Sequence, residues 1–133
     1  DEPLEVLRDA WAGLHFELEA VEVLNQRLWL LREFAGHKLG RGVYAFRPTA
    51  AMPVALQAPH SFGDKHTRGL TAELFVDGQF AAAAFNTVHR NVMDAAHSNA
   101  CHLNAFTTAF LKVHRDDSLV CQLHGFSRSK RTT

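Results

Sequence analysis

The sequence predicts an α/β domain spanning residues 1–133, with a mixed sheet whose parallel core is flanked by helices and extended by an N-terminal antiparallel hairpin. Two observations predict the parallel core. Three apolar segments each lead into a histidine, and helix-like segments separate them, an alternation typical of parallel sheets. The three segments are Val54–Ala58 before His60, Ala81–His89, and Ser118–Gly125 with His124. Because ligands bind beyond the carboxyl ends of strands in such sheets, these histidines are expected to share one edge.

The N-terminal half predicts a helix followed by antiparallel strands. Residues 3–14 begin with a proline suited to a first helical turn and carry one apolar stripe, made of Leu4, Leu7, Trp11 and Leu14. Residues 16–21 fit either a continued helix or an alternating strand, and we favour the strand. Gln26–Glu33 and Gly42–Arg47 are predicted strands joined by a glycine-containing hairpin loop, in which His37 is expected to be exposed.

Two helices are predicted between the histidine-tipped strands. Thr67 is expected to cap the first helix, which ends at Asp77–Gly78. The second follows Asn99 and ends at Asp116–Asp117. Their apolar residues are Leu70, Leu74 and Phe75 in the first, and Leu103, Phe106, Phe110 and Val113 in the second. Right-handed crossovers would then make the three C-terminal strands parallel.

Composition excludes several classes of function. Acidic and basic residues balance at 14 each, so the sequence shows no electrostatic footprint for nucleic acid or an anionic membrane. No apolar run reaches the roughly 18 residues that a membrane span needs. Of the two cysteines, Cys121 is expected to be an inert core thiol, and a disulfide to Cys101 is expected only in an exported protein. Oligomeric state leaves no signature in this sequence.

The chain contains nine histidines, an enrichment that points to metal binding or acid–base chemistry. His60 and Asp64 lie four residues apart on a predicted turn, and His124 follows a neighbouring strand. Two imidazoles and one carboxylate with an open fourth position are typical of catalytic zinc in hydrolases. The alternative is a structural role, in which each histidine ends a strand and hydrogen-bonds locally.

The other histidines allow structural as well as functional interpretations. His66 is expected to be a surface residue, with a second-layer partner or a ligand as less favoured alternatives. His15 and His114 are expected to be structural or exposed, and His102 to start the second helix and pack there. His89 with the following Arg90 ends a predicted strand, where the arginine suits a substrate carboxylate or merely contacts solvent.

The segment 91–102, NVMDAAHSNACH, is polar and dense in functional groups. It connects a predicted strand to a predicted helix at the same edge. Asp94 and His97 are therefore candidates for substrate positioning or for the acid and base of a reaction. A metal-free hydrolase that uses His97, Asp94 and Ser98 is one alternative that this segment leaves open.

The segments PVALQAPHSFGD, FNTVHRNVMDAAHS and LVCQLHGF together resemble the zinc carboxypeptidase-like hydrolases, in particular the poly-gamma-glutamate hydrolase and N-formylglutamate amidohydrolase branches. The resemblance covers about residues 53–126. It implies zinc held by His60, Asp64 and His124. It also implies that Asn86 or Arg90, beside His89, binds a substrate carboxylate.

The sequence departs from that family in two respects. The first two ligands are spaced His-x-x-x-Asp rather than His-x-x-Glu, and no Glu follows Glu73 to serve as the family's general base. The base would come from Asp94 or His97, the chain would be a fragment of a larger hydrolase, or the domain would bind a metal or anion without turnover.

From these patterns we expect a zinc-dependent enzyme that hydrolyses an amide or peptide-type bond in a small-molecule or peptide substrate with a free carboxylate. The chain begins at Asp1 without a methionine, as a processed or trimmed chain would, which points weakly towards export to the periplasm or outside the cell. The tail GFSRSKRTT is unlike a natural domain end.

Overall fold

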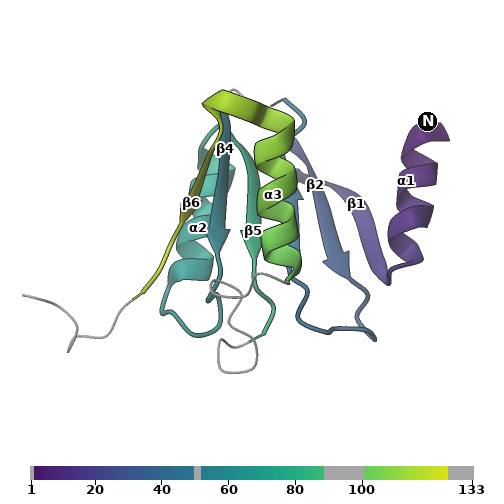
Figure 1. Ribbon diagram of the computed structural model, residues 1–133, viewed down its shortest axis with the longest axis horizontal. Coiled ribbons are helices and arrows are strands. Elements are labelled where there is room, and N and C mark those ends of the chain that lie inside the picture. Colours follow the sequence, from purple (N-terminus) through teal and green to yellow (C-terminus); the bar gives the residue numbers. More distant parts are fainter. Residues whose placement is uncertain (1, 50–51, 89–100, 126–133) are drawn as a thin grey trace, which may run out of the picture.

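The computed structural model describes residues 2–49, 52–88 and 101–125 (Figure 1). Its elements in chain order are α1 (Glu2–Ala12), β1 (Phe16–Val23), β2 (Gln26–Glu33), β3 (Val43–Phe46), β4 (Met52–Ala58), α2 (Thr67–Asp77), β5 (Phe80–Phe85), α3 (His102–His114), a 3-10 turn (Arg115–Asp117) and β6 (Leu119–Gln122). The predicted fold class, a mixed sheet flanked by helices, is confirmed. None of the helices in these described ranges is long and apolar enough to span a membrane.

The described strands form one sheet in the order β1-β2-β3-β5-β4-β6. β4 pairs in parallel with β5 on one side and with β6 on the other, as the alternation of strands and helices predicted. The strands β1, β2 and β3 continue the sheet through antiparallel pairs. The first histidine-tipped strand therefore lies between the other two, and the carboxyl ends of all three lie at one edge.

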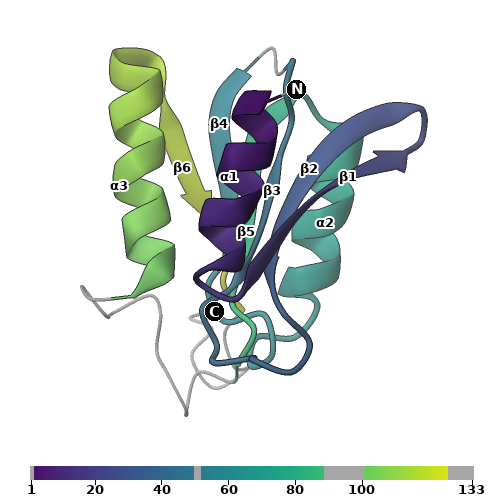
Figure 2. The ribbon, with the colours of Figure 1, turned by 90° about the vertical axis from the view of Figure 1, so that its right-hand side faces the viewer.

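Helices α2 and α3 cover opposite faces of the sheet, whereas α1 lies beside β1 at the far end (Figures 1 and 2). β5 carries four consecutive alanines, Ala81–Ala84, all of them buried. Small side chains on this strand let α2 pack close to β4 and β5, whereas a cavity separates α3 from the alanines on the other face. On the α3 face the core includes Phe16, Leu31 and Phe110, and on the α2 face Leu28, Leu56 and Phe75.

Several predicted details differ from the structure. The first helix ends at Ala12 rather than residue 14, and Leu7 and Leu14 of its predicted stripe are exposed. Thr67 does not cap α2, because His66 occupies the N-cap position and the Thr67 hydroxyl donates to the carbonyl oxygen of Asp64. The apolar face of α2 is also different, since Thr67, Thr71 and Phe75 are buried whereas Leu70 and Leu74 are exposed.

The core-thiol prediction for Cys121 is wrong, because β6 is an edge strand and Cys121 is exposed there. Cys101 is the buried cysteine, and its sulfur accepts a hydrogen bond from the backbone N–H of Asn104 at the start of α3. The two cysteines are not joined by a disulfide. On α3, Leu103 and Phe110 are buried as predicted, whereas Val113 is exposed.

A buried arginine after β3 hydrogen-bonds to the carboxyl end of α2. The Arg47 guanidinium donates to the carbonyl oxygens of Phe75 and Phe80 and to the side-chain oxygen of Gln26. Because burial disfavours its charge, the pKa of Arg47 is lowered. The cation nevertheless lies at the carboxyl end of α2, where the helix dipole favours positive charge.

A buried glutamate organises the loop after β2. The Glu33 carboxylate accepts hydrogen bonds from the backbone N–H groups of Leu39 and Arg41, from the Arg41 guanidinium and from the Thr87 hydroxyl. Burial alone would raise the pKa of Glu33, but the backbone hydrogen bonds and Arg41 together hold it below its ordinary value. Since β2 runs in the same direction as β5, this loop lies at the edge where β4, β5 and β6 end.

The Glu33 interaction predicts a pH-dependent contribution to stability. A carboxylate whose pKa is depressed on folding stabilises the native state above its unfolded-state value, here near 4.5, and loses this effect as the pH falls further. We expect Glu33→Gln to lower the free energy of unfolding by about 1–3 kcal/mol at neutral pH. The difference from the wild type should shrink below pH 4.5. Urea denaturation from neutral to acidic pH measures the loss of stability and its dependence on pH.

Glu22→Gln is the matched control, because Glu22 pairs with Arg27 at 3.5 Å where both side chains are about two-thirds exposed. Such exposed pairs contribute little to stability. A Glu33→Gln effect that stays the same at every pH would contradict the role of the Glu33 charge.

Candidate metal centre

His60 and Asp64 are brought together by a single helical turn after β4. The carbonyl oxygen of His60 accepts hydrogen bonds from the N–H groups of Gly63, at 2.9 Å, and Asp64, at 2.8 Å. Pro59 precedes this turn, and its lack of an N–H group suits a point where strand pairing ends. Residues four apart on one turn lie on the same side. His60 Nδ1 accordingly lies 3.3 Å from Asp64 Oδ2.

His124 reaches the same carboxylate from β6. The pairing of β6 with β4 continues past the last strand residue, because the N–H of Leu123 donates to the carbonyl oxygen of Gln57. The next residue then places His124 Nδ1 at 3.6 Å from Asp64 Oδ2. The N–H of Gly125 donates to the same oxygen at 2.9 Å. Two imidazoles and one backbone N–H thus converge on a single carboxylate oxygen.

The geometry of the three side chains fits one divalent cation. Each of His60, Asp64 and His124 offers one ligand atom, and these atoms lie within 4.8 Å of one another. Tetrahedral zinc with ligands at 2.0–2.2 Å holds neighbouring ligand atoms roughly 3.4 Å apart. The two Nδ1–Oδ2 distances, 3.3 and 3.6 Å, lie on either side of that value. The two distances to the carboxylate oxygen are therefore compatible with zinc.

The centre has a buried side and an open side. His60 is 2% exposed and Asp64 8%, whereas the His124 side chain is 40% exposed. Within the described residues no fourth His, Cys, Asp or Glu joins the three. Two ligands are therefore held by the protein core, and solvent reaches the group from the side of His124.

The predicted substrate and acid–base residues are only partly covered by the structure. Asn86 lies at the end of β5 and is buried, and its backbone N–H donates to the carbonyl oxygen of Ala58, two residues before His60. Its side-chain oxygen accepts from the N–H of Val88. The remaining predicted positions lie outside the described residues: His89, Arg90, Asp94, His97 and Ser98.

The other histidines that the structure describes do not join the centre. His66 is exposed at the N-cap of α2, and His102 is the exposed first residue of α3. His15 and His114 are exposed as expected, and so is His37. The ring of His37 stacks on that of His15 at 4.3 Å between centroids, a contact that the sequence did not suggest.

Three residues that support the centre were not predicted from the sequence. Gly125 donates its N–H to Asp64, and the side-chain oxygen of Gln122 accepts from His124. Gln57 is fully buried in β4 and hydrogen-bonds to Gln122. An amide in the middle of the apolar run Val54–Ala58 was the available signal, because a buried amide requires polar partners.

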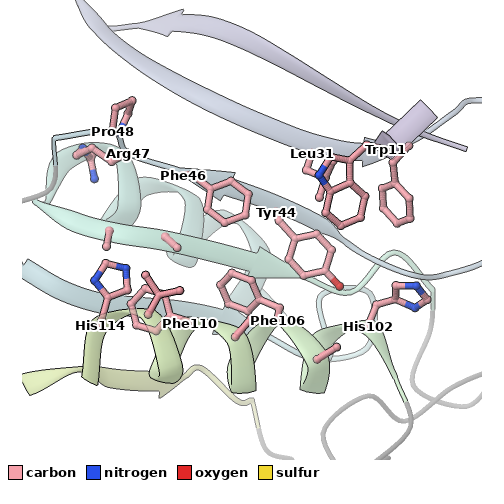
Figure 3. Close-up of a pocket in the computed structure, with 16 residues that line it drawn as sticks. Trp11, Leu31, Tyr44, Phe46, Arg47, Pro48, His102, Phe106, Phe110 and His114 are labelled. Atoms are coloured by element: carbon pink, nitrogen blue, oxygen red, sulfur yellow. The ribbon is translucent and has the colours of Figure 1, made fainter. Parts of the chain in front are cut away.

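A cavity lies apart from the candidate centre. It has a volume of about 570 Å³ and lies between α3 and the sheet, with His114 at one end and His102 at the other (Figure 3). None of the three candidate ligands lines it. Its Tyr44 hydroxyl donates to the carbonyl oxygen of Arg41, and burial above all raises the pKa of Tyr44. The mainly apolar walls make this cavity less suited to hydrolytic chemistry than the edge beyond β4.

Gly125 yields a test of the geometry around Asp64. A Cβ added at this glycine would lie 3.1 Å from the Cβ of Asp64, closer than ordinary van der Waals contact. We expect Gly125→Ala to displace the carboxylate or the backbone after His124 and to weaken zinc binding by about tenfold, within the range for supporting residues of metal sites. Isothermal titration calorimetry with zinc measures the loss.

Gly69→Ala is the matched control, because an added Cβ there meets nothing within 4 Å. Equal zinc affinity in the two alanine variants would show that the contact between Gly125 and Asp64 does not shape the centre.

Comparisons of the chain with models of protein families, with curated proteins and with solved structures found no match. The similarity to zinc carboxypeptidase-like hydrolases therefore stays a prediction, carried by the short motifs around His60 and His124.

Proposed function

We propose that this protein is a zinc-dependent hydrolase of an amide or peptide-type bond in a substrate that carries a free carboxylate. One observation carries the proposal: His60, Asp64 and His124, which come from two strand ends, meet around a point that suits one cation. The resemblance of the surrounding motifs to zinc carboxypeptidase-like hydrolases supports the same reading.

The number and exposure of the ligands favour a catalytic over a structural metal. Structural zinc sites are closed by four protein ligands, whereas catalytic sites use three and keep a position open for water or substrate. Here three candidate ligand atoms lie close together. Two belong to buried side chains, and the third belongs to His124, whose side chain is 40% exposed. A substrate would approach from the side of His124.

The protein side chains have distinct roles in this proposal. His60 and Asp64 provide ligands that cannot move away, because the turn after β4 fixes both. His124 completes the set at the solvent side. Zinc bound in this way supplies Lewis acidity, which lowers the pKa of water and polarises a carbonyl group. The N–H of Gly125 holds Asp64 Oδ2 in place, so that the carboxylate does not have to be reorganised when a cation enters.

Substrate binding and proton transfer are assigned to the polar segment after β5. A guanidinium binds a carboxylate bidentately, so Arg90, together with Asn86 and His89, would hold the free carboxylate of the substrate. The Arg90 cation would also help to stabilise the oxyanion. Asp94 and His97 would exchange protons with the water and the leaving amine. Glu33 does not suit the role of general base, because its carboxylate is buried and accepts hydrogen bonds from Leu39 and Arg41.

A metal-binding module without turnover is the second candidate function. The observation that favours it is the engagement of Glu33, a carboxylate at the same edge as the centre, together with the absence of any Glu after Glu73 in the sequence. In such a module the same three ligands would hold zinc, but no proton acceptor would be positioned for hydrolysis.

The proposal predicts that zinc content and hydrolysis are lost together. The wild-type protein is expected to contain about one zinc per chain and to hydrolyse members of an N-acyl and γ-glutamyl amino-acid library. His60→Ala should abolish both, because one buried ligand is removed. His124→Ala should have the same effect, and its partly exposed side chain makes misfolding less of a concern. Elemental analysis and an amine-release assay measure the two quantities.

His114→Ala is the control, since His114 is exposed at the opposite end of α3 from the centre. Full activity in His60→Ala, or activity that survives exhaustive chelation, would rule out the zinc hydrolase. One zinc per chain without any hydrolysis would select the binding module.

The acid–base assignment predicts a different pattern. Asp94→Asn and His97→Ala should retain wild-type zinc content, because neither is a proposed ligand. Replacing the residue that acts as the general base should lower kcat by about 10²–10⁴-fold. Steady-state kinetics beside elemental analysis separate this from ligand loss. Wild-type kcat in both variants would exclude the two residues from proton transfer.

A further inference from the structure

A row of polar side chains connects His124 to helix α3. The Nε2 of His124 lies 3.2 Å from the Oε1 of Gln122, and the Nε2 of Gln122 lies 2.9 Å from the Oε1 of Gln57. The Nε2 of Gln57 lies 2.6 Å from the hydroxyl of Thr107. Gln57 and Gln122 are register partners in the parallel pair β4–β6, so the row follows from strand pairing.

The direction of donation along this row is set at its α3 end. The Thr107 hydroxyl has one proton, and it donates that proton to the carbonyl oxygen of Leu103 one turn earlier, at 2.9 Å. Its oxygen can then only accept from Gln57, so the amide nitrogen of Gln57 must face it. The amide oxygen of Gln57 consequently faces Gln122 and requires a donor there.

The same logic continues to the imidazole. Gln122 donates its amide nitrogen to Gln57, so its amide oxygen is the atom that faces His124. A histidine nitrogen next to a carbonyl oxygen must carry the proton. His124 Nε2 is therefore the protonated nitrogen, and Nδ1 keeps its lone pair on the side of Asp64.

Burial explains why the row does not simply reverse. Turning the Gln57 amide alone would place its nitrogen against the nitrogen of Gln122, and Gln57 is 0% exposed, so no water would intervene between these two donors. Gln122 and His124 are exposed, and their hydrogen bond by itself would compete with solvent. The buried residues Gln57 and Thr107 thus fix the orientation of the Gln122 amide, which the exposed hydrogen bond between Gln122 and His124 could not maintain alone.

We propose that Thr107, Gln57 and Gln122 form a positioning relay that holds His124 as the Nε2–H tautomer and so presents Nδ1 as its metal-binding atom. The part of the inference that concerns the metal rests on the proposed zinc function. The tautomer part does not, because it concerns the protein's own hydrogen bonds. Metal-binding histidines generally donate their other N–H to an acceptor, and here the acceptor is itself oriented by a helix on one face of the sheet.

The test compares four variants in the metal-free protein and with zinc. Gln122→Met removes the acceptor at an exposed position, and Thr107→Val removes the hydroxyl that sets the direction. Gln122→Glu keeps an acceptor for His124, but it replaces the donor to Gln57 with a negatively charged acceptor. Thr108→Val is the control, because this neighbouring threonine is exposed on α3. The readouts are the ¹⁵N chemical shifts of the His124 ring, at a pH where the imidazole is neutral, and the dissociation constant for zinc.

We expect the wild type, Gln122→Glu and Thr108→Val to show the Nε2–H form, and Gln122→Met and Thr107→Val to show a mixture of tautomers. Zinc affinity should fall about tenfold in Gln122→Met and recover in Gln122→Glu. If these residues had a purely structural role, the substitutions would change stability without changing the tautomer of His124, and Gln122→Glu would not restore zinc affinity.

Unchanged ring shifts in both Gln122→Met and Thr107→Val would overturn the relay. If the wild type binds no zinc while the tautomer still responds to these substitutions, the zinc function fails and the relay stands. If the wild type binds zinc and neither substitution alters tautomer or affinity, the relay fails and the zinc function stands.

Discussion

The parallel pairing of β4 with β6 is the constraint on which the candidate centre depends. This one ladder places the chain after Gln122 beside the turn after β4, so that His124 meets Asp64. The same ladder sets Gln57 opposite Gln122 and thereby builds the row of amides behind the imidazole. A shift of one residue in this register would turn the side chains of β6 to the other face, and both arrangements would be lost together.

Asp64 is the point where these contacts converge. A carboxylate that is 8% exposed needs partners, and the N–H of Gly125 donates to its Oδ2. The Nδ1 atoms of His60 and His124 lie 3.3 and 3.6 Å from the same oxygen. The backbone N–H fixes the oxygen from one side. The three side chains thus combine a buried carboxylate with one candidate ligand, His124, that solvent can reach, which is the combination that a metal with an exchangeable position requires.

Much of the fold follows from local patterns in the chain. The bounds of β2 were predicted to the residue, and the alternation of strands and helices after Pro53 indicated the parallel pairs correctly. The failures have a common cause. Cys121 and Val113 have apolar neighbours in sequence, but β6 is an edge strand and the end of α3 extends beyond the core, so both are exposed. Apolar character alone does not say how much of an element the rest of the protein covers.

By itself, the sequence determined which segments form strands and helices, and it identified His60, Asp64 and His124 as a set, because hydrophobic period and turn residues are properties of neighbouring positions. The tertiary structure alone decided that β4 lies between β5 and β6, that Gly125 supports Asp64, and that Gln57 reaches Thr107. Strand order, register and the direction of a hydrogen-bond row depend on which segments, far apart in the sequence, pack against one another and exclude water. Patterns within a segment do not specify those partners.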